Sequence, residues 1–171
     1  MSQDDAASPD LVSMSVTGLM LDPSSNVPIV ILRDVGRTLF LPIWIGVAEA
    51  QAIALRMEGV ATPRPLTHDL LLQMCERLGG AIEKIVISDL KEGTFFAEIH
   101  LLPEEPRRIL DARPSDAIAL ALRAQAPIFV RRAVLDQAQV IATNLDPTDD
   151  AERIRRVLEE LNPDDPGRYT M

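Results

Sequence analysis

Apolar residues recur along the chain with two different spacings, and the change from one spacing to the other predicts the order of strands and helices. Alternating or β-branched apolar segments bounded by turn residues predict strands over residues 11–21, 27–33 and 38–45. Helical spacing follows over residues 48–58 and ends at Gly59. A second helix is expected from Thr67, its predicted N-cap, to Gly79-Gly80, with Asp69 in its first turn.

The second part of the chain repeats this order of elements. Strands are predicted over residues 82–90, 94–102 and 107–110, followed by a helix over residues 114–124. A brief strand over residues 127–131 and a short helix over residues 133–138 complete the pattern. The sequence therefore predicts an α+β fold, with a mixed or antiparallel sheet and packed helices.

A short sequence echo accompanies the two similar halves. Ala52-Ile53-Ala54-Leu55 matches Ala117-Ile118-Ala119-Leu120, and each segment follows predicted strands. Four matching residues of common types are weak evidence of a repeat. Together with the shared order of elements, they make a duplicated βββα unit about as probable as its absence.

Polar segments flank this domain, which we expect to cover residues 11–140. Residues 1–10 are predicted to be a disordered tail. Residues 141–161 are predicted to hold a linker and an appended C-terminal helix, whose apolar face comprises Ile154, Val157, Leu158 and Leu161. Residues 162–171 form a polar tail in this interpretation.

Composition limits the possible functions. The net charge of −9 over 171 residues argues against a protein that coats nucleic acid through bulk electrostatics. The polar start lacks the pattern of a signal peptide, and no apolar run approaches the ~20 residues of a membrane span. We therefore expect a cytoplasmic protein without a membrane partner. Cys75 falls in an apolar helical pattern and is predicted to be a buried thiol.

The first candidate site precedes and begins the second helix, where Arg64, His68 and Asp69 cluster. Free N–H groups at a helix N-terminus favour anions. His68 is a candidate general base, and Asp69 could orient it or bind a metal ion. The alternative is a capped helix start with a solvent-facing histidine.

The second candidate site is the segment Asp111-Ala112-Arg113-Pro114-Ser115-Asp116, which leads into an almost wholly apolar helix. Pro114 suits the first turn of a helix, and Asp116 suits its dipole. Paired carboxylates could hold Mg²⁺ or Mn²⁺, and the arginine could hold a phosphate. The structural alternative is that Asp116 supports the dipole while Arg113 pairs with Asp111.

Other motifs add little chemistry. Glu98 and His100 share one face of a predicted strand and are expected on the polar side of the sheet rather than in a metal pair. The sequence has no Gly-rich phosphate loop, no Gly-x-Ser-x-Gly elbow, no Cys-x-x-Cys pair and no His-Glu-x-x-His. The sequence therefore gives no support for an ATPase, a serine hydrolase or a zinc enzyme. We also expect no organic cofactor.

Taken together, the motifs resemble the bifunctional nuclease family, whose domain was formerly one of unknown function. The similarity covers roughly residues 11–140, and no single motif carries it. The matching segments, in order, are Leu41-Pro42-Ile43-Trp44-Ile45-Gly46, Glu49-Ala50, Asp69-Leu70-Leu71, Asp89-Leu90, Thr94-Phe95-Phe96-Ala97, residues 111–122 and Pro127-Ile128.

The resemblance implies a compact α+β domain that forms homo-oligomers and, as assigned to plant members, cleaves both DNA and RNA. Combined with the two candidate sites, it leads to the hypothesis of a nuclease that depends on a divalent metal, Mg²⁺ or Mn²⁺. The predicted catalytic residues are His68, Asp69 and Asp116, and Arg64 and Arg113 would bind substrate. The predicted metal ligands are Glu49, Asp69, Asp111 and Asp116.

The rival hypothesis is a non-catalytic, oligomeric binding or regulatory module, in which these polar residues cap helices and fix subunit contacts. The acidic net charge favours it. The two hypotheses differ in what they expect of the carboxylates. A nuclease should gather them in an open cleft, whereas the rival should bury Arg113 and Asp116 in ion pairs or at an interface.

Overall fold

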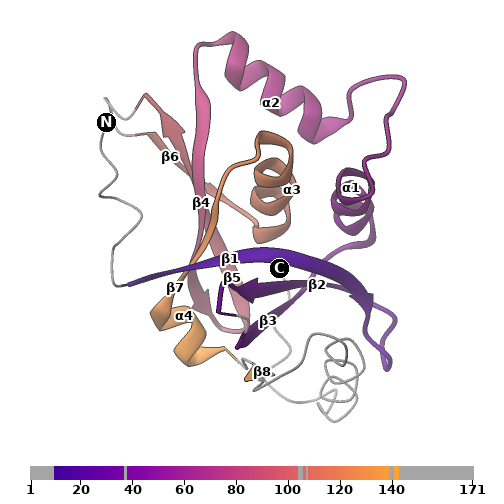
Figure 1. The fold of residues 1–171 in the computed structure, drawn as a ribbon, viewed down its shortest axis with the longest axis vertical. Helices are drawn as coiled ribbons and strands as arrows, with labels where there is room; N and C mark the ends of the chain where they lie inside the picture. The colour runs from indigo at the N-terminus through magenta and orange to yellow at the C-terminus, as the bar shows by residue number, and fades with distance from the viewer. Residues whose placement is uncertain (1–9, 37, 104–105, 107, 139–140, 143–171) are drawn as a thin grey trace.

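A curved, eight-stranded sheet forms the framework of the described part of the chain (Figure 1). The computed structural model describes residues 10–36, 38–103, 106, 108–138 and 141–142. The order across the sheet is β6-β5-β4-β7-β1-β2-β3-β8. The strands are β1 (Leu11–Leu21), β2 (Pro28–Asp34), β3 (Leu39–Trp44), β4 (Ala81–Lys91), β5 (Thr94–Leu102), β6 (Arg108–Ala112), β7 (Ile128–Arg131) and β8 (Ile141–Ala142).

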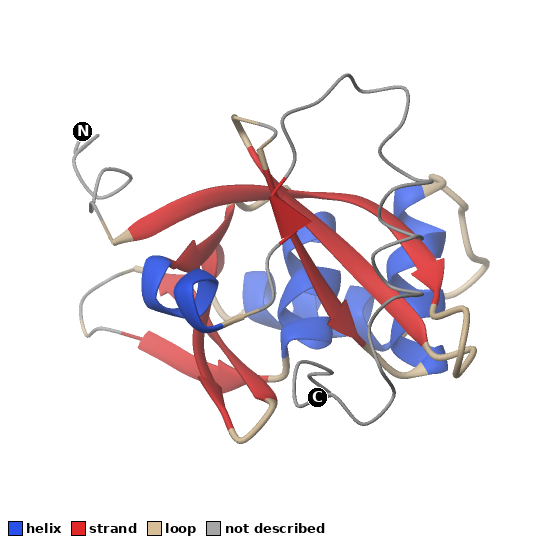
Figure 2. Cartoon of the chain, turned by 90° about the horizontal axis from the view of Figure 1, so that it is seen from below, coloured by secondary structure: helices blue, strands red, loops and turns tan. Residues whose placement is uncertain are grey.

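Three helices gather on one side of this sheet, as Figures 1 and 2 show: α1 (Val47–Met57), α2 (Thr67–Arg77) and α3 (Pro114–Ala124). α3 packs against both α1 and α2 and also against β4 and β5. The short α4 (Arg132–Gln137) lies beside β4 and β7. This arrangement confirms the predicted α+β class, with a mixed sheet and packed helices.

The sheet is antiparallel except at its centre. β1 to β3 form one antiparallel set, and β4 to β6 form another. β7 joins the two sets, because it pairs in parallel with β4 and antiparallel with β1. A parallel pair needs a long crossover connection. Here the chain between β4 and β7 passes through β5, β6 and α3, which places α3 over the middle of the sheet.

The main core lies between the sheet and α3, and it is mostly aliphatic, as the scarcity of aromatic residues requires. Seven residues of α3, including Ala117, Ile118 and Leu120, are buried. Strand alternation supplies the opposite wall, where Ile85 and Ile87 of β4 pair with Ile99 and Ala97 of β5. The predicted burial of the helix over residues 114–124 is therefore confirmed, and its first turn includes the buried Pro114 and Ala117.

The two halves share an element order, since β1-β2-β3-α1 is followed later by β4-β5-β6-α3. The echoing segments at residues 52–55 and 117–120 lie in α1 and α3, which pack together. A common order of elements does not demonstrate duplication, so the duplicated unit stays a prediction.

Two local predictions for α2 are wrong. Leu66, not Thr67, is the N-cap residue, and Asp69 Oδ2 accepts a hydrogen bond from the Leu66 N–H at 2.9 Å. Cys75 is partly exposed rather than buried, and the same holds for the whole helix, since α2 contains no buried residue. An amphipathic spacing shows which helix face is apolar, but it does not show how deeply that face is covered.

The predicted disordered tail and C-terminal elements fall mainly among residues that the structure does not describe, namely 1–9 and 143–171. Within the described residues, none of the helices is both long and apolar enough to cross a membrane.

Candidate functional site

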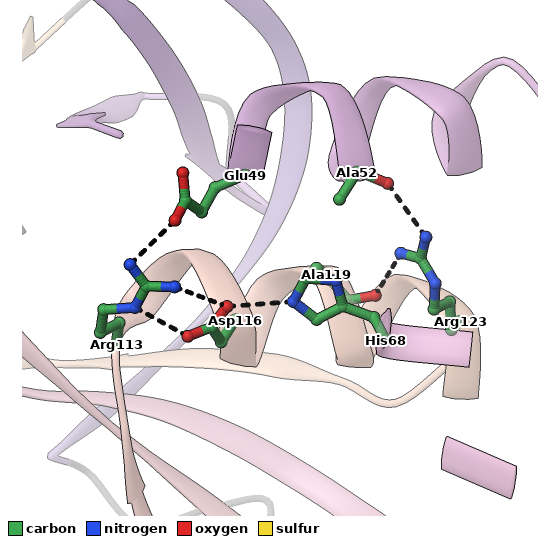
Figure 3. A network of polar contacts seen from close by, with 7 residues as sticks. All are labelled: Glu49, Ala52, His68, Arg113, Asp116, Ala119 and Arg123. Atoms are coloured by element: carbon green, nitrogen blue, oxygen red, sulfur yellow. Dashed lines mark hydrogen bonds and ion pairs between the residues drawn. The ribbon is translucent and has the colours of Figure 1, made fainter. Parts of the chain in front are cut away.

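The N-terminal turns of α1 and α3 lie side by side and define one end of the candidate site. The two helices run in the same direction, so that Glu49 lies near Arg113 and Ala52 lies near Arg123 (Figure 3). Glu49 and Asp116 each lie in the first turn of their helix. Carboxylates are favoured there by the positive end of the helix dipole. The parallel packing therefore brings two carboxylates from distant parts of the sequence to the same end of the helix pair.

Arg113 connects these two carboxylates. It is the N-cap residue of α3, and its extended backbone turns its side chain back over the first turn. Its Nε donates to Asp116 Oδ2 at 2.8 Å and its Nη2 to Asp116 Oδ1 at 3.1 Å, while Nη1 donates to Glu49 Oε1 at 2.8 Å. These bonds use three of the five N–H donors that a guanidinium carries. The Arg113 side chain is 54% exposed, so its remaining donors are accessible from solvent.

Gly46 leaves room for the Glu49 side chain. It is the N-cap residue of α1, and a Cβ atom at this position would collide with the Glu49 carboxylate. The glycine therefore allows Glu49 to fold back over the start of its own helix while it pairs with Arg113. In the sequence, Gly46 indicated only the end of a strand.

His68 reaches the same cluster from α2. Its Nε2 lies 3.0 Å from Asp116 Oδ1, and the histidine side chain is 12% exposed against 30% for that of Asp116. Asp116 therefore contacts both Arg113 and His68, as Figure 3 shows. An ionised carboxylate accepts hydrogen bonds only, so this contact places the imidazole proton on Nε2 and leaves Nδ1 as the acceptor.

The charges of this group, which we call the Asp116 cluster (Glu49, His68, Arg113 and Asp116), stabilise one another. Burial on its own would raise the pKa of Asp116, but hydrogen bonds from Arg113 and His68 outweigh it and lower that pKa below its usual value. The Asp116 hydrogen bonds also raise the pKa of Arg113, against the opposing effect of burial. The aspartate therefore stays ionised at neutral pH and the arginine stays protonated.

The Asp116 cluster forms part of the wall of a pocket of about 670 Å³, which we call the first pocket. Its wall comes from α1, the connector between α1 and α2, the start of α2 and the start of α3, and it includes the four cluster residues. A pocket of this size can admit a nucleotide-sized ligand. The carboxylate–histidine pair can move a proton there, and the guanidinium can bind an anion.

A second polar network fastens the three helices together further along α1 and α3, and Figure 3 shows its contacts with Ala52 and Ala119. Arg123 is only 5% exposed, and its Nε donates to Asp69 Oδ1 at 2.6 Å. Its Nη1 and Nη2 donate to the carbonyl oxygens of Ala119 and Ala52. One side chain thus links α1, α2 and α3. Through Asp69 it holds the first turn of α2, which also contains His68.

The structure brings together some of the predicted site residues and separates others. Glu49, His68, Arg113 and Asp116 meet in one cluster, whereas the Asp69 carboxylate pairs with Arg123 and caps the start of α2. Arg64 lies along an adjacent pocket. The roles predicted for Asp69 in catalysis and for Arg64 in substrate binding stay predictions.

Asp111 lies in a different environment. It pairs across the sheet with Glu98 in β5, on the face opposite to the buried Ala97 and Ile99. Arg113 pairs with Asp116 and Glu49 rather than with Asp111, so the Arg113–Asp111 pair of the structural alternative is wrong. The predicted polar face is confirmed, since His100 Nε2 lies 3.1 Å from Glu98 Oε2.

The predicted metal ligands do not fit a metal ion in this arrangement. The two that meet, Glu49 and Asp116, share the Arg113 guanidinium, which lies where a cation would have to bind both of them. Across the described residues, no group of three or more His, Cys, Asp and Glu side chains is placed to hold a metal ion. Metal dependence stays a prediction of the sequence.

Sequence reasoning missed Arg56 and Arg123. Each lies seven residues after an acidic residue of the cluster, Arg56 after Glu49 and Arg123 after Asp116. Seven residues make about two helical turns, so each arginine lies on the same helix face as its acidic partner. This spacing was the available signal, and it is shared by α1 and α3.

Sequence comparisons show which known proteins this chain resembles. The chain is 41% identical over 159 residues to an uncharacterized protein of Mycobacterium tuberculosis, covering 88% of this chain and 94% of that protein. It is 28% identical to Bifunctional nuclease 1 of Oryza sativa subsp. indica, covering 66% of this chain and 35% of the rice protein. For Bifunctional nuclease 2 of Arabidopsis thaliana the identity is 27%, covering 61% and 32%.

A model of one protein family, the Bifunctional nuclease domain, matches residues 30–143. These residues include the whole Asp116 cluster together with α1, α2 and α3. The match extends over more than half of the chain and contains both candidate sites. The chain therefore belongs to the bifunctional nuclease domain family.

Proposed function

We propose that this protein hydrolyses phosphodiester bonds of DNA and RNA in the first pocket, using the Asp116 cluster. The observation that carries the proposal is the position of Asp116, whose carboxylate contacts the His68 imidazole on one side and the Arg113 guanidinium on the other. A proton acceptor and an anion-binding group are thereby held together beside one pocket. Membership of the bifunctional nuclease domain family supports the same function.

In the proposed reaction, His68 Nδ1 takes a proton from a water molecule as the water oxygen attacks phosphorus. The bond from phosphorus to the sugar oxygen breaks, and that leaving oxygen takes a proton from a second water molecule on the opposite side of phosphorus. The imidazolium returns its proton to the resulting hydroxide. The products are an alcohol and a phosphate monoester, so atoms and charge balance. Asp116 keeps His68 in the required tautomer and stabilises the imidazolium.

Arg113 would act on the phosphoryl group. The two N–H donors that its contacts with Glu49 and Asp116 leave over can bind phosphate oxygens, and they can stabilise the additional negative charge of the transition state. Glu49 would hold the guanidinium in place, as a positioning residue. No step of this scheme uses a metal ion, because the described carboxylates do not form a ligand set.

The experiment measures cleavage of plasmid DNA and of RNA by the purified protein, each with Mg²⁺, with Mn²⁺ and with EDTA. We expect H68A/D116N to lower the cleavage rate at least about a hundredfold, as loss of a general base does. The matched control is E98Q/H100A, which disrupts the other carboxylate–histidine pair, outside the pocket, and which should cleave like the natural sequence. Cleavage that persists in H68A/D116N reports any contaminating nuclease.

Each arm has a decisive outcome. Equal cleavage by H68A/D116N and E98Q/H100A would contradict the proposal, as would the absence of cleavage by the natural sequence under all three conditions. Cleavage that is lost in EDTA and restored by Mn²⁺ would support the metal dependence predicted from the sequence and would require the Asp116 cluster to rearrange.

A second candidate function is favoured by the outer face of α2. Leu70, Leu71, Met74 and Leu78 are 52%, 48%, 53% and 81% exposed, which is unusual for consecutive turns of one helix face. Three of them line an apolar groove of about 280 Å³ together with Leu110 of β6. We propose that a second copy of this chain covers this face. Such an oligomer is compatible with nuclease activity, and without that activity it would make the protein a binding module.

A further inference from the structure

A second polar pocket adjoins the first one. It encloses about 380 Å³, and four residues, Leu55, Thr62, Pro65 and Leu66, line both pockets. The end of α1 and the connector between α1 and α2 therefore border both pockets, which lie next to each other along α1. We call the second cavity the Arg56–Arg64 pocket, after two of its lining residues.

The two pockets differ in the sign of their charge. In the first pocket, the carboxylates of Glu49 and Asp116 exceed the single guanidinium of Arg113 by one negative charge when His68 is neutral. In the second pocket, Asp69 neutralises Arg123, and the charges of Arg56 and Arg64 remain. An anion is therefore attracted more strongly to the Arg56–Arg64 pocket than to the pocket that holds the Asp116 cluster.

The two arginines are available to a ligand. Arg56 uses its Nε to donate to the Leu122 carbonyl oxygen at 3.1 Å, which fixes the base of its guanidinium and leaves Nη1 and Nη2 for other acceptors. Arg64 lies on the exposed connector, and the Thr62 hydroxyl donates to the Arg64 carbonyl oxygen at 2.8 Å. Within the part of the chain that the structure describes, neither guanidinium is paired with a carboxylate.

The spacing of the pockets suits a polymer. Arg56 follows Glu49 by seven residues along α1, which is about 10 Å along the helix axis. The connector places Arg64 on the same side of this helix, because Leu55 and Thr62 belong to both pockets. A strand that carries phosphates at regular intervals could therefore occupy both pockets at once.

We propose that the Arg56–Arg64 pocket binds a second phosphate of the nucleic-acid strand whose scissile phosphodiester lies in the first pocket. This inference rests on the proposed function. The Arg56 and Arg64 guanidinium groups anchor the strand along α1, and they compensate for the net negative charge around the reacting phosphate. The site favours a strand with several phosphates over a ligand with one phosphate, although the whole protein is acidic.

The test measures binding without cleavage. A fluorescein-labelled single-stranded DNA oligonucleotide with cleavage-resistant phosphorothioate linkages is titrated with protein at several salt concentrations, and its fluorescence anisotropy gives the Kd. We expect R56Q/R64Q to raise the Kd about tenfold, because charge-assisted hydrogen bonds to one phosphate are lost. The slope of log K against log salt should become shallower by about 0.7, the value for one phosphate contact on a single strand.

The matched control is R77Q/R132Q, which removes two exposed arginines that do not line either pocket. It lowers the net charge by the same amount and should leave the Kd within about twofold of the natural value. R64Q on its own should change the Kd in the same direction as R56Q/R64Q, and it provides the test if the double variant is unstable.

Equal weakening by the two double variants would overturn the inference, because only the total charge would then matter. Absence of binding by the natural sequence would overturn it as well. If binding depends on Arg56 and Arg64 but the natural protein cleaves no substrate, the anchor stands and the proposed hydrolysis fails. The two proposals are thus tested separately.

Discussion

Asp116 determines what the neighbouring residues can do, because it is the one residue of the cluster that contacts both Arg113 and His68. Its pKa lies below the usual aspartate value, since the hydrogen bonds from Arg113 and His68 outweigh the effect of burial. The carboxylate therefore keeps its charge through the pH range in which an imidazole changes protonation. A fixed negative partner gives the histidine a fixed tautomer, which is what a general base needs.

The sequence identified the residues of this cluster but not their partners. Pro114 and Asp116 indicated the helix start correctly, because capping depends on neighbours in the sequence. One of the two partners of Arg113 is Glu49, 64 residues away, and only the packing of α1 on α3 brings them together. Asp111 shows the opposite case, since strand pairing carries it away from its neighbour Arg113 and places it opposite Glu98.

Arg113 meets one expectation of each of the two hypotheses that the sequence left open. Its side chain lies in ion pairs, as a structural role requires, yet it is half-exposed at the wall of an open pocket, as a site requires. Ion pairing and accessibility thus occur in the same residue. The proposed phosphate binding depends on the two N–H donors that remain on the guanidinium, which lines the first pocket.

Helix elements were predicted well where a local signal marks their ends. The helix over residues 114–124 has the predicted bounds, and the left-handed backbone of Gln125 ends it. The helix predicted over residues 48–58 is displaced by one residue, to Val47–Met57. The start of α2 was misassigned because its cap uses the Asp69 carboxylate and the Leu66 N–H rather than a hydroxyl side chain.

The relative positions of α1, α2 and α3 depend on Arg123. This side chain is almost fully buried and contacts all three helices. In R123A the Asp69 carboxylate and two carbonyl oxygens would lose their donor, so we expect a loss of about 3 kcal/mol in the free energy of unfolding. The thermal midpoint measured by circular dichroism should fall by roughly 10 °C.

The control for this variant is R77A, which removes an exposed arginine from the last turn of α2 and should change the midpoint by no more than about 2 °C. A midpoint for R123A within this range would show that the buried arginine does not fasten the helices. The position of His68 would then need another explanation.

The whole molecule combines an acidic net charge with one pocket where basic residues gather. The charge of −9 was a reason to doubt nucleic-acid binding. The arrangement of charges changes that argument, because Arg56 and Arg64 leave a local positive field next to the Asp116 cluster. A net charge describes long-range attraction, whereas binding of one strand depends on the charges along its path.

The exposed face of α2 predicts self-association of the whole molecule. L71D/M74D places charge in the apolar groove between α2 and β6 and should dissociate the oligomer that we expect from the natural chain. Sedimentation-velocity ultracentrifugation measures the change in mass. L21D/V35D, at two other exposed apolar positions, is the matched control and should keep the natural mass. A monomeric natural chain would contradict this prediction.

The central claim is that His68 carries a proton in phosphodiester hydrolysis. Its most direct test is chemical rescue of H68A, measured as the cleavage rate of a labelled oligonucleotide with and without added imidazole. We expect H68A to lower the cleavage rate at least about a hundredfold. Imidazole can occupy the space that the His68 side chain leaves in the first pocket, so we expect it to restore part of the rate in proportion to its concentration. A rate for H68A equal to that of the natural sequence, or a loss that imidazole leaves unchanged, would contradict the account.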